Sequence, residues 1–130
     1  MARNGADFTL MFRWLCDAAV SADRDAGVRS LFTDPSSFDD WAVRWRHRLA
    51  EDGGKADERR AAMHAANPVF IPRNHLVEEA ISAAVNVGDF QPFESLLTVL
   101  SVPYEDQPAF TRHVDPPRPD QVVRQTFCGT

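Results

Sequence analysis

The chain has 130 residues, of which 44% are apolar and 25% are charged, and its formal net charge is −5. This composition is that of a single globular domain and excludes a disordered chain. The basic residues are scattered among acidic ones, and this distribution argues against a nucleic acid as partner. No apolar run is long enough to cross a bilayer, and the first ten residues, "MARNGADFTL", have no apolar signal-peptide centre, so we expect a cytoplasmic protein with no membrane partner.

Apolar residues at spacings of three and four predict a first helix near the start of the chain. Cys16 lies on its apolar face, where we expect it to pack as a small hydrophobic residue. The other members of that face are Phe8, Met11, Phe12, Leu15, Ala19 and Val20. A second helix follows Asp34, which can cap it, and Pro35, which suits a first helical position, and it ends at Gly53 and Gly54. The buried face of this second helix is predicted to contain Phe38, Trp41, Trp45 and Leu49.

Three more helices are predicted in the middle of the chain. Strong helix formers fill residues 55–66, and that helix stops before Asn67 and Pro68 because a residue that precedes proline avoids helical geometry. The next helix runs from about Leu76 to Gly88, which supplies a C-terminal stop. Its apolar face is formed by Val77, Ala80, Ile81, Ala84 and Val85. The fifth helix, "QPFESLLTVL", is predicted to point Phe93, Leu96, Leu97 and Leu100 inward.

Prolines dominate the chain beyond Val102 and leave little room for a regular element. No stretch alternates with the period of two that is typical of strands. We therefore predict an all-α fold: a small helical domain of about five helices over residues 1–102, followed by a proline-rich extended C-terminal tail over residues 103–130.

The stretch "NPVFIPRNHLVEEAI", from Asn67 to Ile81, poses the question of a site. Two prolines stiffen it, and three polar residues follow them. We predict that Asn74 is an N-cap, so that Asn74→Ala costs about 1 kcal/mol of stability, while Arg73 and His75 can contact another element. The residues that mark this signature stretch are Asn67, Pro68, Pro72, Arg73, Asn74 and His75.

The usual catalytic and metal-binding patterns do not occur. Tryptophans and arginines interleave in "WAVRWRHRL" as in some surfaces that stack on bases, but the helical period favours a core face for Trp41 and Trp45. The histidines and cysteines are not paired at zinc-ligand spacing, and the phosphate-loop, hydrolase-elbow and zinc-protease motifs are missing from the sequence. We therefore predict no catalytic, cofactor-binding or metal-binding residue in this chain.

Four stretches carry a resemblance to a known family. "ADFTLMFRWLCD", "AANPVFIPRNHLVEEAI", "GDFQPFESLLTVLSVPYEDQP" and the terminal "TFCGT" resemble the C-terminal end of the selenoprotein O (SelO) family of protein adenylyltransferases. The resemblance extends through essentially the whole chain. It implies a parent enzyme with a kinase-like fold that transfers AMP from Mg-ATP to hydroxyl side chains of proteins.

The motifs that such chemistry requires are a lysine on the phosphates and an aspartate and asparagine on the metal. In the family these lie in the kinase-like core, and they are missing from this sequence. The resemblance therefore implies a C-terminal helical region without an active site, inactive alone, whose partner is the missing kinase-like core. The signature stretch is then a packing and docking element.

Cys128 stands third from the end of the chain, on the tail, where an exposed thiol can reach another cysteine. The resemblance implies a redox-regulatory role, through a disulfide with a cysteine of the kinase-like core. Since that partner is not in this sequence, we expect the Cys128 thiol to be free or to pair between molecules.

Two hypotheses follow. A fragment of the enzyme should expose an apolar patch where the missing core docks, and it should tend to self-associate. The alternative is a free-standing helical interaction module from a split or truncated gene, which binds another protein through its tail or its helix faces. A kinase-like domain encoded in frame upstream would decide for the first hypothesis, and a genuine start at Met1 for the second.

Overall fold

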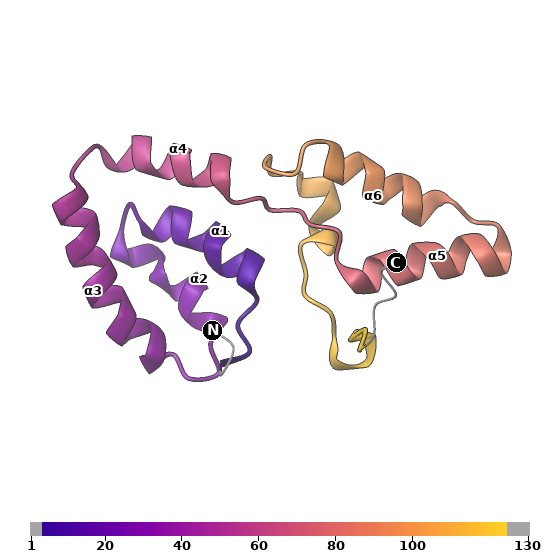
Figure 1. The fold of residues 1–130 in the computed structure, drawn as a ribbon, viewed down its shortest axis with the longest axis horizontal. Coiled ribbons are helices and arrows are strands. Elements are labelled where there is room, and N and C mark those ends of the chain that lie inside the picture. The colour runs from indigo at the N-terminus through magenta and orange to yellow at the C-terminus, as the bar shows by residue number, and fades with distance from the viewer. Residues whose placement is uncertain (1–3, 125–130) are drawn as a thin grey trace, which may run out of the picture. The chain divides into compact units, whose positions relative to one another are not determined.

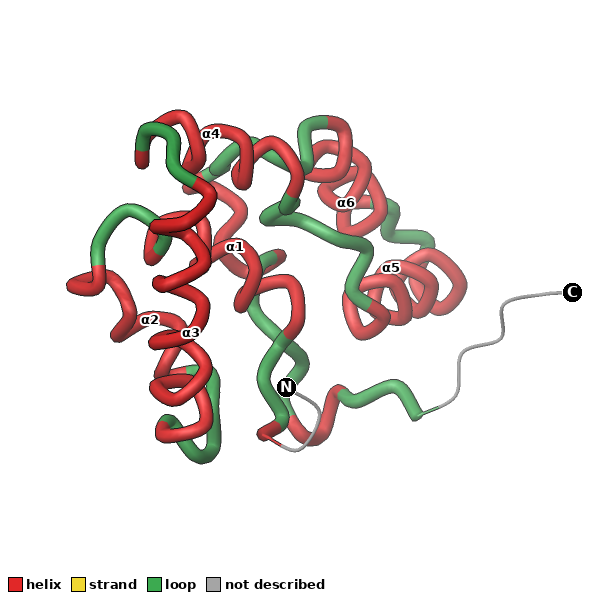
Figure 2. Tube along the Cα trace, turned by 60° about the vertical axis from the view of Figure 1, so that its left-hand side comes forward, coloured by secondary structure: helices red, strands yellow, loops and turns green. Residues whose placement is uncertain are grey.

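The computed structural model describes residues 4–124. Within these residues it contains six α-helices and three short 3-10 helices, and no strand (Figure 1, Figure 2). The all-α prediction is therefore confirmed. The chain divides into two compact units, a first unit up to Val69 and a second unit from Phe70 onward.

The first unit is built around α1 (Phe8–Ala18), which lies between α2 (Asp25–Ser30) and α4 (Ala56–Ala66) in Figure 1. A short 3-10 helix, η2 (Ala22–Arg24), leads into α2, and α3 (Ser36–Asp52) packs on α2. The core of the unit contains Met11, Leu15, Ala18, Val28, Phe32, Phe38 and Ala42. Because α1 has neighbours on two sides, it also buries residues outside its predicted apolar face.

Side-chain caps fix where α1 and α3 begin. The Asp7 carboxylate accepts a hydrogen bond of 2.8 Å from the Leu10 amide at the start of α1. The Asp34 carboxylate accepts one of 3.1 Å from the Ser36 amide at the start of α3, as predicted. Pro35, between Asp34 and Ser36, already has helical dihedral angles, with φ −60° and ψ −23°.

The second unit is a helical hairpin of α5 (Asn74–Val87) and α6 (Gln91–Ser101). Gly88 joins the two helices with a left-handed φ of 69°, and its amide donates to the Ala84 carbonyl, which confirms the predicted stop. Leu76, Ala80 and Leu96 form the small core of the hairpin.

The proline-rich segment after α6 contains two short 3-10 helices, η3 (Pro108–His113) and η4 (Pro119–Gln121), so it is less extended than predicted. The Gln107 side chain donates a 3.0 Å hydrogen bond to the Val99 carbonyl of α6. Arg112 forms an ion pair with Glu79 of α5. These contacts attach the segment to the hairpin.

Candidate functional site

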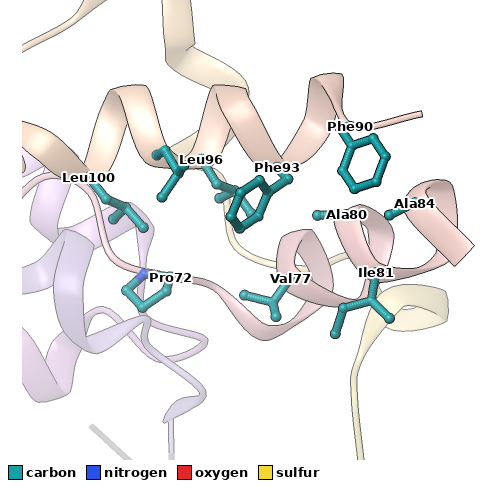
Figure 3. Close-up of a pocket in the computed structure, with 10 residues that line it drawn as sticks. Pro72, Val77, Ala80, Ile81, Ala84, Phe90, Phe93, Leu96 and Leu100 are labelled. Carbon is teal, nitrogen blue, oxygen red and sulfur yellow. The ribbon is translucent and has the colours of Figure 1, made fainter. Parts of the chain in front are cut away.

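An apolar groove of about 360 Å³ lies between α5 and α6. All of its lining residues are apolar, and they come from both helices and from the segment that precedes α5. They are Pro72, Val77, Ala80, Ile81, Ala84, Phe90, Phe93, Leu96, Leu97 and Leu100. In Figure 3, Phe93 and Leu100 of α6 point toward α5. We call this surface the hairpin groove.

Several large side chains of the hairpin groove are exposed to solvent. The exposed fraction is 51% for Ile81, 58% for Phe90 and 55% for Leu97. The sequence predicted that Phe93 and Leu97 point inward and are buried, and for their burial the prediction is wrong: both are exposed, because the described residues of the second unit do not cover this side of α6. An apolar surface of this kind marks a site of interaction. The exposed patch that the fragment hypothesis predicts is therefore present.

The chemistry of the hairpin groove suits an apolar partner. Its lining offers no carboxylate for Mg²⁺ and no lysine or arginine for a triphosphate, so it does not fit Mg-ATP. In the part of the chain that the structure describes, no group of three or more His, Cys, Asp or Glu side chains is placed to hold a metal ion. What the hairpin groove can do is bury a hydrophobic surface.

The signature stretch contributes to both units. In the first unit, the Asn67 side chain ends α4 by donating a 2.7 Å hydrogen bond to the Met63 carbonyl, and its amide nitrogen also lies 3.8 Å from the Cys16 sulfur. Pro68 follows and is half-buried. In the second unit, Pro72 lines the hairpin groove, whereas Arg73 is buried at the N-cap position of α5. The stretch therefore has separate local roles, and only Pro72 belongs to the groove.

Asn74 is the first residue of α5 and not its N-cap, so that prediction is wrong. Arg73 has the extended dihedral angles of a cap, with φ −64° and ψ 129°, and the cap position makes no side-chain hydrogen bond to the helix. The Arg73 carbonyl instead accepts from the amides of Leu76 and Val77. A helical Asn74 is one position too late to serve these amides with its side chain.

Asn74→Ala is accordingly expected to change the free energy of unfolding by less than about 0.5 kcal/mol, because no capping bond is lost. Urea unfolding followed by far-UV circular dichroism measures the change. Leu76→Ala is the reference variant, since truncation of this buried side chain should lower the free energy of unfolding by about 2 to 5 kcal/mol. A loss of 1 kcal/mol or more for Asn74→Ala would restore the cap assignment.

Two histidines of the second unit have a lowered pKa. Partial burial lowers the pKa of His75, and the nearby charges of Arg73 and Arg112 lower it further. Partial burial also lowers the pKa of His113, again with a contribution from Arg112. The folded unit therefore favours neutral imidazoles.

The second unit should accordingly lose stability in mild acid. In the unfolded chain a histidine has a pKa of about 6.5, which is above the lowered pKa of His75 and His113 in the folded unit. The stability that the two neutral imidazoles contribute is therefore complete above that pH, and it is lost as the pH falls through the folded pKa values. Thermal unfolding at a series of pH values between neutral and mildly acidic measures this loss. The double variant His75→Gln, His113→Gln should show a flatter pH dependence; an unchanged profile would mean that other groups cause it.

The two cysteines lie far apart in the chain. Cys16 is fully buried in α1, its thiol donates a 3.2 Å hydrogen bond to the Phe12 carbonyl, and burial raises the pKa of the thiol. The prediction that it packs as a small hydrophobic residue is confirmed. Cys128, the predicted redox residue, lies outside the described residues.

The tryptophans of α3 lie on the core side, as predicted. The rings of Trp41 and Trp45 stack with their centroids 5.1 Å apart, and both pack against the core of the first unit. Of the interleaved arginines, Arg46 pairs with Asp25, and Arg48 pairs with Asp52 at 3.2 Å.

The sequence did not predict a polar cluster that joins α1 and α4. The Asp17 carboxylate lies 2.5 Å from Arg60 Nε and 3.3 Å from His64 Nε2. Partial burial raises the pKa of Asp17, but the hydrogen bonds and charges of Arg60 and His64 outweigh it, so the net pKa is lowered. Arg13 is buried and donates to the carbonyls of His64 and Asn67 at the end of α4. These contacts hold the two helices together.

No described helix is both long enough and apolar enough to span a membrane.

A family model described as "Protein adenylyltransferase SelO" matches residues 1–101. The chain is 58% identical to a "Protein nucleotidyltransferase YdiU" of Bradyrhizobium sp. (strain BTAi1), and 55% identical to proteins of the same name in Rhodopseudomonas palustris (strain BisB5) and Nitrobacter winogradskyi. Each alignment covers 100% of this chain and 26% of the relative, so the chain spans about a quarter of the length of the curated relatives that it matches.

Proposed function

Because this chain belongs to the SelO family of protein adenylyltransferases, we propose that it is the C-terminal helical region of such an enzyme and that it docks on the catalytic part. The whole enzyme would transfer AMP from Mg-ATP to a hydroxyl side chain of a protein and release pyrophosphate. The residues that bind Mg-ATP would belong to a kinase-like core (a pseudokinase fold), which would occupy the remaining part of the polypeptide. This region alone would be inactive.

The observation that carries the proposal is the uncovered hairpin groove on a chain that spans a quarter of its relatives. Burying apolar surface contributes roughly 25 cal/mol per Å², so an exposed groove of this kind is stabilised by a partner. About three quarters of each relative lies outside the matched segment, and under the proposal it would supply a partner within the same polypeptide. Without that partner, two isolated chains would be expected to associate through their hairpin grooves.

Two further parts of the proposal rest on the sequence. A regulatory disulfide from Cys128 to the catalytic part is what the family resemblance implies. A cytoplasmic location agrees with the presence of only two cysteines, which are too few for a disulfide framework. Both parts can be examined in the whole enzyme.

Isothermal titration of Mg-ATP into the purified 130-residue chain, under reducing conditions, is expected to give only the heat of dilution. The reason is that the hairpin groove offers no charged group to the nucleotide or to its metal. Saturable heats would show a nucleotide site within these helices and would count against an accessory role.

A chimera tests the activity of the whole enzyme. In it, this chain replaces the matching segment of the Bradyrhizobium sp. relative, with which it shares 58% of its residues. The chimera and the intact relative should both transfer labelled AMP from ATP to proteins of a cell lysate, whereas the isolated chain should not. A well-folded chimera without transfer, beside an active relative, would contradict the proposed role.

A further inference from the structure

We infer that the occupant of the hairpin groove is an amphipathic helix of the remaining polypeptide, with an apolar stripe flanked by lysine or arginine. This inference rests on the proposed function, because it takes the occupant from the part of the parent enzyme that lies outside this chain. It adds the secondary structure and the charge of that occupant. Both follow from the lining and the rim of the hairpin groove.

The lining favours a helix over an extended strand. The hairpin groove lies between two helices, whose backbone groups are engaged within those helices, and it presents only apolar side chains. A strand laid there would leave its own N–H and C=O groups against hydrocarbon without partners. A helix satisfies its backbone internally and can place residues at spacings of three and four into the groove.

The length of the hairpin groove sets the number of anchors. From Phe90 to Leu100 the lining follows α6 for about 15 Å, at 1.5 Å per residue. A helix of the same length has close to three turns. It therefore presents three or four apolar anchors to the groove.

The rim is acidic. Glu78 precedes Ile81 by three positions in α5, and Glu94 precedes Leu97 by three in α6, so each carboxylate neighbours a groove residue on its own helix. Among residues 4–124, Glu78 and Glu94 form no ion pair with a lysine, arginine or histidine. Of the arginines near the hairpin, Arg73 is buried and Arg112 is paired with Glu79 of α5. A partner with a basic rim complements this charge and avoids repulsion.

The inference is tested by photo-crosslinking in the chimera. Benzoylphenylalanine replaces Phe93 in the hairpin groove, and in a control it replaces Thr98, an exposed residue of α6 that does not line it. Mass spectrometry then identifies the crosslinked peptide. We expect the probe at position 93 to label one helical segment of the relative, with apolar residues three and four apart and lysine or arginine beside them, and the probe at 98 not to label it.

The charge is tested in the same chimera with Glu78→Lys and Glu94→Lys together, which should reduce the crosslinking yield at position 93 several-fold. The matched control is Glu105→Lys, an exposed residue outside the hairpin groove, and it should leave the yield unchanged. Crosslinks to a strand or loop, to a second copy, or to no segment would overturn the inference, as would a yield that the double variant does not change.

These outcomes separate the two proposals. A chimera that transfers AMP but crosslinks elsewhere retains the proposed function and refutes the helical occupant. A chimera that crosslinks to a basic helix but transfers no AMP retains the helical occupant and contradicts the proposed function.

Discussion

Phe38→Ala is expected to lower the free energy of unfolding of the first unit by about 3 to 5 kcal/mol, the usual cost of deleting a buried phenylalanine ring. The Phe38 side chain is only 1% exposed, and its ring centroid lies 5.8 Å from that of Phe32 and 5.9 Å from that of Trp41. Its removal leaves a cavity between α3 and the segment after α2. Urea unfolding followed by tryptophan fluorescence measures the loss, because all three tryptophans lie in the first unit.

The matched control for this substitution is Val43→Ala on the same helix. The Val43 side chain is 72% exposed, so its truncation should change stability by less than about 0.5 kcal/mol. Equal effects of the two substitutions would show that Phe38 is not part of a packed core.

Leu97→Asp is expected to weaken docking of this chain on the rest of the parent enzyme by roughly 100-fold or more. The substitution places a carboxylate in an apolar groove, where covering it without a partner charge costs several kcal/mol, and 1.4 kcal/mol is a factor of ten in affinity. The measurement is fluorescence anisotropy of the labelled chain, titrated with the Bradyrhizobium sp. relative from which the matching segment has been deleted.

The isolated chain should tolerate Leu97→Asp, because that side chain is already 55% exposed. The matched control is Thr98→Asp, which adds the same charge one position along α6, outside the hairpin groove, and it should leave the affinity nearly unchanged. Equal losses for the two variants would point to a general charge effect, and tight binding by Leu97→Asp would place the contact elsewhere.

The regular elements with clear apolar periodicity could be predicted from the sequence. The stop at Gly88 and the cap at Asp34 follow from local chemistry, since a left-handed φ suits glycine and a carboxylate accepts from amides near a helix start. The short α2 was missed, because its six residues are too few to show a helical period. The cap at the start of α5 was misplaced by one position, because the N-cap preference of asparagine points to Asn74, whereas Arg73 has the extended backbone and caps the helix without a side-chain hydrogen bond.

The polar contacts between helices could not be predicted, because they join residues far apart in the chain. Arg13 belongs to the first helix, and its acceptors are carbonyls at the end of α4. Backbone carbonyls carry no signal in the sequence. The helical period of α1 indicates one apolar face, but α1 packs against neighbours on two sides.

The hairpin groove shows a different limit of the sequence. Ile81 and Leu97 lie on apolar stripes, which predict burial, yet both are exposed in this structure. The periodicity records which faces are apolar and not which partner covers them. Under the proposed function the stripes are correct for the whole enzyme, and the covering element belongs to the three quarters of the relatives outside this chain.

The central claim is that the rest of the enzyme covers the hairpin groove, and thiol labelling tests it most directly. Leu97→Cys and, separately, Thr98→Cys are introduced into the isolated chain and into the chimera, and the rate of reaction with a maleimide is followed at each position by peptide mass spectrometry. The dilute isolated chain should react rapidly at both positions. In the chimera, position 97 should react at least tenfold more slowly while position 98 keeps its rate; equal rates at position 97 in the two proteins would contradict the account.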